Sequence, residues 1–364
     1  MKSPGNGWLV GDPVSCVATG GAVTGKHEFP DADHQSAFSA RTASRDDTDL
    51  SVVIITYNEA DRIGECLDSV FAACSEWLDF EVILVDSNST DGTVDIAVDY
   101  PITVLQIPDD DLTTPAAGRH VGTIASLSDT ILFVDGDMSI HREWLESAMA
   151  YLDERPGVAA VDGQLNEPAA EETVQSVDAV RGVALYHKDA LLSVGGFDPY
   201  LQSLEDIHLG FKLTHAGYDL RRLPTVAGHH PIREGVTEPI RRWKRGYMTG
   251  TGQAIRESTT EPTLLVKHLL RLRYHLITLG WVLVGVFSLL SPPVFLVWVI
   301  LSTIAYAVVA TKLGIGQAFR FFFGKLVGTI GLIRGLFKKP LDATSFPHDR
   351  IRLVQRGPVH RVDE

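Results

Sequence analysis

Three fully apolar runs, each followed by polar residues, constrain the fold of this chain most strongly. They are residues 52–55, 82–85 and 131–134. A strand that is apolar at every position is typical of a parallel sheet buried on both faces. An amphipathic helix carrying Ile63, Leu67 and Val70 is expected after the first run. This β-α-β order predicts an open, mostly parallel sheet with right-handed crossovers and helices on both faces.

The third apolar run ends in two aspartates, Asp135 and Asp137, on either side of a glycine. Ligands of open α/β sheets bind at the carboxyl ends of the strands. Two carboxylates placed there can hold a divalent cation, and the cation can clamp a diphosphate. The pattern alone is weak, because paired aspartates often form only a solvated turn. Residues 109–111, three more aspartates, are interpreted as such a turn because prolines flank them.

Composition and missing motifs exclude several classes of protein. The formal net charge of −14 argues against a nucleic-acid partner, because binding to phosphates needs a basic surface. The chain has neither a G-x-G-x-x-G motif after the first strand nor a P-loop, so a dinucleotide-binding fold and a P-loop fold are both disfavoured. Residues 1–48 are polar and lack periodicity, which predicts a disordered tail.

Two charge-free apolar segments, 276–290 and 294–310, are separated by Ser-Pro-Pro. Each is slightly short for a hydrocarbon core of about 30 Å. With interfacial residues added they predict a transmembrane hairpin over 263–312, and a buried soluble hairpin is the alternative. Cations flank both outer ends, which places both ends in the cytoplasm. Because cations are spaced along its apolar sequence, 313–340 is expected to form an interfacial amphipathic helix. Residues 341–364 are expected to form an irregular tail.

Seven short motifs occur in a characteristic order between residues 50 and 250. Together they resemble those of the family 2 glycosyltransferases, which have the GT-A fold, invert the anomeric centre and depend on a metal. The resemblance implies a GT-A domain over 49–262. The motifs are TYNE at 56–59, VDSNSTDGT at 85–93, AAGRHVG at 116–122, FVDGD at 133–137, GGFD at 195–198, LED at 204–206 and RRW at 241–243.

The resemblance assigns roles to residues of the donor site. It places four residues around the nucleoside, Asp86 beside the base and Arg119 near the base or diphosphate, although Arg119 in isolation is an ordinary surface arginine. Asp135 and Asp137 would hold Mg²⁺ or Mn²⁺ on the donor, and His229, or its neighbour His230, would complete the metal shell. The four nucleoside residues are Thr56, Tyr57, Asn58 and Glu59.

A second set of residues concerns the acceptor. Inversion in one displacement needs a carboxylate to take the acceptor proton, and Asp206 with Glu205 beside it is the candidate. The plainer explanation is that two acidic residues stabilise a helix N-terminus. Arg242 and Trp243 resemble the end of a Q-x-x-R-W motif, but Pro239 replaces the glutamine. That departure favours single additions over processive synthesis.

These observations predict a glycosyltransferase in the cell membrane, with several spans and a cytoplasmic catalytic domain. It would move one sugar from a nucleotide-sugar, with a UDP-sugar expected first. The acceptor would be a polyprenyl (dolichol) phosphate or a lipid-linked glycan, in glycoprotein or cell-surface glycan assembly. A nucleotidyltransferase is one alternative, but it would need a glycine-rich basic loop after the first strand. A catalytically silent scaffold is another, but it would be expected to lack Asp135, Asp137 or Asp206.

Overall fold

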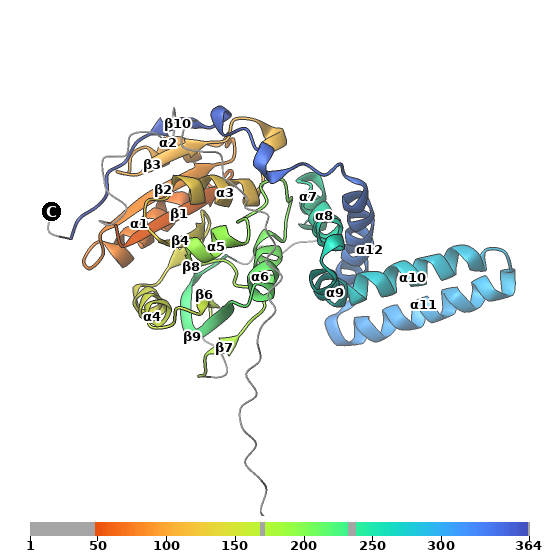
Figure 1. Cartoon of the computed structure of the whole chain (residues 1–364). Helices are drawn as coiled ribbons and strands as arrows, with labels where there is room; N and C mark the ends of the chain where they lie inside the picture. Colours follow the sequence, from red (N-terminus) through yellow and green to blue (C-terminus); the bar gives the residue numbers. More distant parts are fainter. Residues whose placement is uncertain (1–47, 168–171, 232–237, 363–364) are drawn as a thin grey trace, which may run out of the picture.

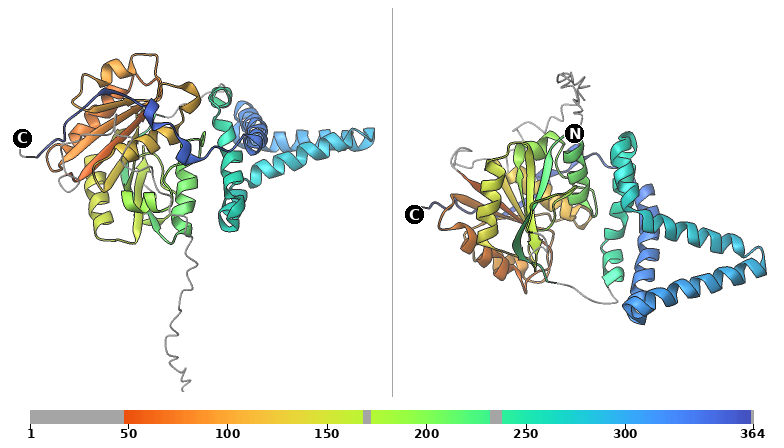
Figure 2. Two further views of the ribbon diagram at one scale, coloured as in Figure 1. Left: turned by 45° about the horizontal axis from the view of Figure 1, so that its top comes forward. Right: turned by 90° about the horizontal axis from the view of Figure 1, so that it is seen from below.

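The computed structural model describes residues 48–167, 172–231 and 238–362. The disordered tail expected over 1–48 therefore lies outside the described residues, except for Thr48. An α/β domain comes first in the chain, and a group of C-terminal helices follows it (Figure 1). A pair of long helices projects away from the domain in every view (Figure 2).

The centre of the domain is one ten-stranded sheet with the order β10-β3-β2-β1-β4-β8-β6-β9-β5, in which β7 pairs with β9. The strands β1 to β4 pair in parallel, as expected. Beyond β4 the sheet is mixed, because β8 runs antiparallel to both β4 and β6. The strands are β1 Leu50–Thr56, β2 Phe80–Asp86, β3 Thr103–Gln106, β4 Thr130–Asp135, β5 Ser139–Ile140, β6 Val158–Leu165, β7 Gln175–Ser176, β8 Ala184–His187, β9 Asp219–His229 and β10 Arg352–Gln355.

The register of the parallel strands brings their polar ends to one edge. Thr56 at the end of β1 pairs with Asp86 at the end of β2. On the other side, Ile55 pairs with Asp135 at the end of β4. Three residues that the sequence assigned to the donor site therefore lie on adjacent strands.

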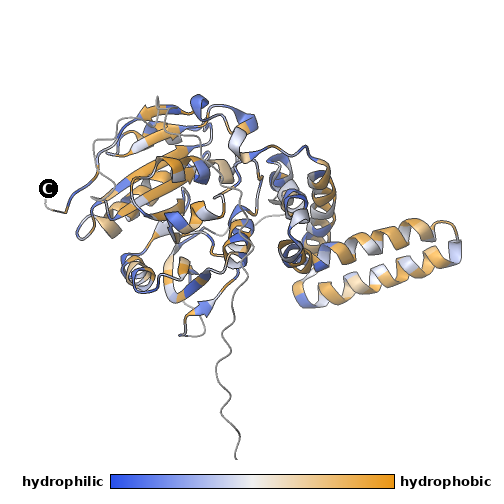
Figure 3. Cartoon of the chain, in the orientation of Figure 1, coloured by the Kyte–Doolittle hydropathy of each residue, from blue (hydrophilic) through white to orange (hydrophobic). Residues whose placement is uncertain are grey.

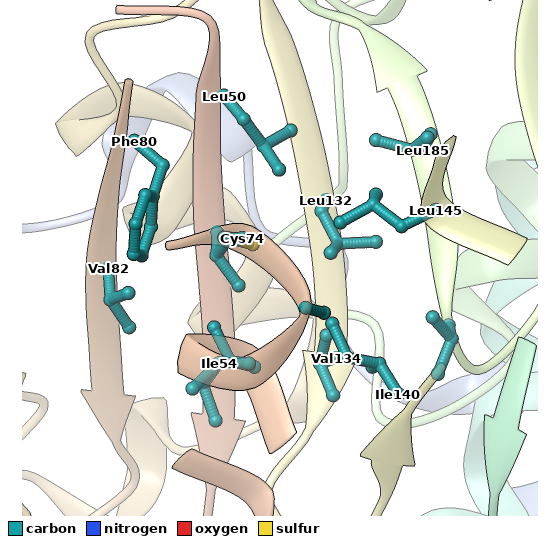
Figure 4. Packing of buried hydrophobic residues seen from close by; sticks show 14 of the residues in the cluster. Leu50, Ile54, Cys74, Phe80, Val82, Leu132, Val134, Ile140, Leu145 and Leu185 are labelled. Carbon is teal, nitrogen blue, oxygen red and sulfur yellow. The ribbon is translucent and has the colours of Figure 1, made fainter. Parts of the chain in front are cut away.

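Helices cover both faces of the sheet. Along β1, Val52 and Ile54 face one core cluster while Val53 and Ile55 face the other, which explains the continuous apolar run. Figure 4 shows the first cluster, in which Leu145 of α4 packs beside the strands. The helices of the domain are α1 Ile63–Cys74, α2 Thr93–Ala97, α3 Pro115–Ala125, α4 Arg142–Asp153, α5 Lys188–Ser193 and α6 Glu205–His215.

Two glycines of α3 allow that helix to lie unusually close to β1. A Cβ at Gly122 would lie 2.2 Å from Cγ1 of Val53, and one at Gly118 would lie 2.9 Å from Cγ2 of Ile55. Both distances are below van der Waals contact, so only glycine fits at this helix spacing. Arg119 lies between the two glycines and is carried close to the sheet with them.

The C-terminal helices are α7 Glu238–Lys244, α8 Gly250–Glu257, α9 Pro262–Arg271, α10 Arg273–Ser288, α11 Pro292–Leu313 and α12 Ile315–Phe337. The paired helices α10 and α11 carry mostly apolar side chains on their surface (Figure 3). In the described part of the chain, α11 alone is long and apolar enough to cross a membrane, with a mean hydropathy of 2.3. The helices α9 and α10 pass the same test only when taken together, and they meet at a 70° bend.

The chain returns to the α/β domain after α12. The expectation of an irregular tail over 341–364 was wrong for β10, which pairs antiparallel with β3 and becomes the edge of the sheet. Phe346 and Ile351 are buried in the second core cluster. The C-terminal segment is therefore part of the folded domain.

Candidate active site

A cavity of about 740 Å³ opens at the carboxyl edge of the parallel strands. The ends of β1 and β4 line it, together with α3, the start of α6, and α7. The sequence-predicted residues that line it are Thr56, Tyr57, Glu59, Arg119, Asp135, Asp137, Glu205 and Arg242. Those that do not line it are Asn58, Asp86, Asp206, His229 and Trp243.

Arg119 is the most connected side chain of the cavity. Its Nη2 donates to Asp135 Oδ1 at 2.7 Å, and its Nη1 donates to Glu205 Oε1 at 2.9 Å. Its side chain is only 7% exposed, so the alternative of an ordinary surface arginine was wrong. Burial lowers the pKa of Arg119, but the two carboxylates outweigh burial and keep it above its usual value. This residue therefore joins the D-x-D strand to the helix that carries the candidate base.

Asp137 of the D-x-D motif and His230, which directly follows β9, lie close together. Nε2 of His230 lies 3.7 Å from Oδ1 of Asp137, and both residues line the cavity. His229, one residue earlier, is exposed and does not line it. The structure thus brings His230, rather than His229, to the D-x-D motif.

The side chains at the D-x-D turn have the oxygen and nitrogen atoms needed to bind a divalent cation. Within residues 48–167, 172–231 and 238–362, no group of three or more His, Cys, Asp or Glu side chains is arranged to hold a metal. Mg²⁺ and similar cations often bind through one or two protein carboxylates, while substrate phosphates and water supply the other ligands. Asp137, with Asp135 and His230 beside it, offers protein ligands of this kind. A Cβ at Gly136 would lie 2.9 Å from Thr56 Oγ1, so glycine keeps the turn against β1.

Some of the residues predicted to contact the nucleoside line the cavity, and others support the loops around it. Asn58 supports the loop, because its Oδ1 accepts a hydrogen bond from Thr90 N at 2.8 Å. Asp86 is fully buried, and its Oδ2 accepts from Ser89 N and from Gln106 Nε2. Oδ1 of Asp86 and Oγ1 of Thr56 are buried without a hydrogen-bond partner in the described structure. Such orphaned polar atoms are costly, so a bound polar group at this edge would be favoured.

Glu205 and Asp206 begin α6 but face different surroundings. Glu205 lines the cavity and binds Arg119, whereas Asp206 accepts a hydrogen bond from Ile207 N at 2.7 Å. Burial raises the pKa of Glu205 to about 7, against the opposing charge of Arg119 and with a further contribution from Asp206. Burial also raises the pKa of Asp206. Both carboxyls therefore bind a proton more readily than an exposed carboxyl does.

A group of cations that the sequence interpretation missed also lines the cavity. Arg241, Lys244 and Arg245 join the predicted Arg242 there, and Arg245 lies over the ring of Tyr57 at 4.9 Å. The signal was present as four basic residues within 241–245 interrupted only by Trp243, whose ring packs under Arg334 instead. Further lining residues that were not predicted include Ser87, Asp110, Gln202 and Tyr247.

Comparisons with known proteins agree with this geometry. The sequence model of "Glycosyl transferase family 2" matches residues 51–188, and that of "Glycosyl transferase family group 2" matches residues 177–311. Glycosyltransferase AglE of Haloferax volcanii is 31% identical over 205 residues, which are 50% of this chain and 67% of AglE. The pre-mycofactocin glycosyltransferase of Mycobacterium tuberculosis is 28% identical over 53% of this chain and 45% of its own length.

A solved structure shows the same fold. The mannosyltransferase PcManGT from Pyrobaculum calidifontis, determined in complex with GDP-Man and Mn²⁺, superimposes with a TM-score of 0.57 at 20% identity. The similarity covers 82% of this chain and 89% of PcManGT. The ordered motifs, the cavity at the carboxyl edge of the sheet and these relatives lead to one conclusion. This chain is a glycosyltransferase that belongs to glycosyl transferase family 2 and has the GT-A fold.

Proposed function

We propose that this protein is an inverting, metal-dependent glycosyltransferase that moves one sugar from a nucleotide-sugar, first of all a UDP-sugar, to a membrane-borne acceptor. The observation that carries the proposal is the pair of hydrogen bonds from Arg119 to Asp135 and Glu205. These bonds hold the D-x-D motif and the first turn of α6 around one cavity. The cavity is then lined by the D-x-D carboxylates and by Glu205, and Asp206 follows Glu205 in α6.

In the donor half, Asp135 and Asp137 would hold Mg²⁺ or Mn²⁺, and His230 lies beside Asp137. When bound, either ion supplies positive charge that stabilises the departing diphosphate. PcManGT, which shares the fold, was solved with GDP-Man and Mn²⁺, and this supports a nucleotide-sugar and a metal here. The cations of residues 241–245 add positive charge beside the diphosphate. Thr56 lines the cavity and would offer its hydroxyl to a polar group of the nucleoside, while buried Asp86 supports the loop beside it.

In the acceptor half, Asp206 is the proposed base. With a lipid-linked glycan as acceptor, its carboxylate takes the proton of the acceptor hydroxyl while that oxygen bonds to the anomeric carbon. A polyprenyl phosphate would instead attack through an ionised phosphate oxygen and would need no base. The bond from the anomeric carbon to the diphosphate breaks, and the diphosphate leaves with the electron pair. Glu205 lies next to Asp206 and, through Arg119, fixes the start of α6 against the D-x-D strand. The donor therefore needs no acid from the protein, because the leaving group is stabilised as an anion.

The acceptor is proposed to be a polyprenyl phosphate or a lipid-linked glycan. The support is the apolar surface of α10 and α11, which projects from the domain as a hairpin (Figure 3). We infer that this hairpin anchors the protein in the cell membrane with two spans. The cations at its outer ends support a catalytic domain on the cytoplasmic side. Glycoprotein or cell-surface glycan assembly would then be the process served.

A panel of UDP-, GDP- and dTDP-sugars tests this proposal. Each donor is incubated with the detergent-solubilised full chain and Mn²⁺, and both donor hydrolysis and donor binding are measured. The expected result is metal-dependent hydrolysis, or metal-dependent binding, of one class of donor. If no donor binds in the presence of Mn²⁺ or Mg²⁺, the proposed function is wrong.

A further inference from the structure

A second cavity, of about 1010 Å³, lies between the catalytic domain and the C-terminal helices. The domain contributes Arg181 and, from α6, Ile207 and Phe211, and the helices α9, α10 and α12 contribute further lining residues. Arg242 and Tyr247 line this cavity as well as the first one. The two cavities are therefore neighbours that share one boundary.

The lining of the second cavity is strongly basic. Seven arginine and lysine side chains line it, but Asp178 is the one carboxylate among its lining residues. Lys267 pairs with Asp178 at 3.0 Å, and Arg222 pairs with buried Asp162 at 2.9 Å. The other cations of the lining are drawn from separate helices of the C-terminal region and from the domain. In the described ranges no ion pair joins a carboxylate to four of them, Arg181, Arg271, Arg273 and Lys325.

Such a group of like charges is unfavourable in a partly enclosed space and is relieved by an anion. Phosphate is the anion that suits several arginines at once, because each guanidinium can donate two parallel hydrogen bonds to it. Aromatic rings complete this wall. Arg273 lies over the ring of Tyr274 at 4.9 Å, and Lys325 lies 5.8 Å from the same ring.

The second cavity adjoins the apolar hairpin formed by α10 and α11. Arg273, which lines the cavity, is the first residue of α10, and the exposed apolar surface of that helix starts within its first turn with Leu276 and Ile277. A molecule with a phosphate in the cavity would therefore have its apolar part beside α10. This combination of charge and apolar surface describes a phosphate-bearing lipid and not a soluble phosphate.

The candidate base lies between the two cavities. Glu205 lines the first cavity, whereas Leu204 and Ile207 line the second, so Asp206 occupies the helical turn that separates them. Arg181 of the second cavity is close enough to Asp206 to oppose the effect of burial on its pKa. A ligand held in the second cavity would therefore approach the donor cavity next to Asp206.

We propose that the second cavity binds the phosphate of the lipid acceptor, with Arg181, Arg271, Arg273 and Lys325 as the residues that recognise it. This inference rests on the proposed function and adds the acceptor site to it. The phosphate anchors the acceptor at the membrane end of the cavity. The acceptor hydroxyl of a lipid-linked sugar then extends toward Asp206 and the donor.

Binding of farnesyl phosphate and of farnesol to the detergent-solubilised full chain tests the assignment. The two probes share an isoprenoid chain and differ only in the phosphate. The wild-type protein is expected to bind farnesyl phosphate about tenfold or more tightly than farnesol, since one charge-assisted contact is worth that much. The double variant Arg181→Gln, Arg271→Gln is expected to lose this preference. Arg271→Lys, which keeps the charge, is expected to retain part of it.

The matched control is Arg352→Gln, which removes an exposed arginine from the edge strand β10, away from both cavities. It should keep the full preference for farnesyl phosphate. Equal wild-type affinity for the two isoprenoids, or an unchanged preference in the double variant, would overturn the inference. Dioleoyl phosphatidylglycerol and inorganic phosphate are measured in parallel. Binding of either as tightly as farnesyl phosphate would overturn the acceptor assignment, because the site would then be one for bulk lipid or free phosphate.

Nucleotide-sugar binding in the same samples separates the two proposals. Wild-type protein that binds a donor with Mn²⁺ but shows no preference for the phosphate probe contradicts the acceptor site alone. Failure to bind any donor contradicts the proposed function instead. Donor binding by the double variant also reports that its catalytic domain is folded.

Discussion

The guanidinium of Arg119 donates to Asp135 at 2.7 Å while its other terminal nitrogen donates to Glu205 at 2.9 Å. The three residues come from α3, β4 and α6, so this bridge sets the spacing between the D-x-D motif and the candidate base. Arg119 can bind both carboxylates because its planar guanidinium group presents several N–H donors in fixed directions. The donor and acceptor halves of the site are thus positioned by one buried side chain.

Replacing Arg119 should destabilise the domain. Arg119→Met leaves Glu205 and Asp135 without their partner in a largely buried place, which should cost about 3 kcal/mol or more in the free energy of unfolding. Denaturant unfolding followed by tryptophan fluorescence measures the loss. The control is Arg142→Met, which removes an arginine that forms two exposed ion pairs, with Glu76 and Glu146. Equal destabilisation by both variants would contradict a special role for Arg119.

The activity should depend on pH through the carboxyls at the start of α6. Burial raises the pKa of Glu205 to about 7, and that of Asp206 is also raised. A base must be ionised to accept a proton, so kcat/KM should rise as the pH increases through about 7 and level off above it. The rising limb belongs to the pair, because the two carboxyls titrate together.

A substitution at Arg119 tests whether these carboxyls cause the rise of kcat/KM with pH. Arg119 lowers the pKa of Glu205, so Arg119→Gln should move the rising limb to higher pH. A pH–rate profile of each protein with the preferred donor measures both positions. A rising limb that stays at the same pH in Arg119→Gln would contradict control of the reaction by this pair of carboxyls.

The glycines of α3 should tolerate no side chain. A Cβ at Gly122 would lie 2.2 Å from Val53 Cγ1, so Gly122→Ala must push α3 away from β1 and displace Arg119. Overpacking of this kind should cost about 1–3 kcal/mol and lower the melting temperature. Gly157→Ala is the control, because nothing lies within 4 Å of a Cβ there. A Gly122 variant as stable as the Gly157 variant would contradict the close approach of α3.

Membrane association should depend on the apolar surface of α11. Leu301 is exposed near the middle of that helix, and an arginine there would cost about 2.5–3.5 kcal/mol on an insertion scale. Leu301→Arg should therefore move the protein out of the carbonate-washed membrane fraction. Leu353→Arg, on the exposed edge strand β10, should have no such effect. Unchanged membrane recovery of the Leu301 variant would contradict a spanning role for α11.

Much of the catalytic domain could be predicted because its signals are local. The expected amphipathic helix carrying Ile63, Leu67 and Val70 is α1, and the three apolar runs became β1, β2 and β4. Their carboxyl ends had to meet at one edge, because the strands are parallel. The grouping of Thr56, Asp135 and Asp137 around one cavity follows from that geometry.

Contacts between distant segments could not be predicted. The strand β10 has only four residues, and it pairs with β3, which lies about 250 residues earlier in the chain. The partners of Arg119 depend on how closely α3 approaches β1, which is set by tertiary packing. The choice between His229 and His230 depends on the direction of each side chain at the end of β9. A shift of one residue in a strand reverses that direction.

The measurement that tests the central claim most directly compares two aspartate variants in metal-dependent donor hydrolysis. Asp137→Ala should lower turnover of the preferred nucleotide-sugar with Mn²⁺ by about a hundredfold or more, because the departing diphosphate loses its charge stabilisation. Asp111→Ala, which removes a nearby aspartate that does not line the cavity, should retain wild-type turnover. Equal turnover by the two variants would contradict the assignment of the D-x-D motif to the donor site.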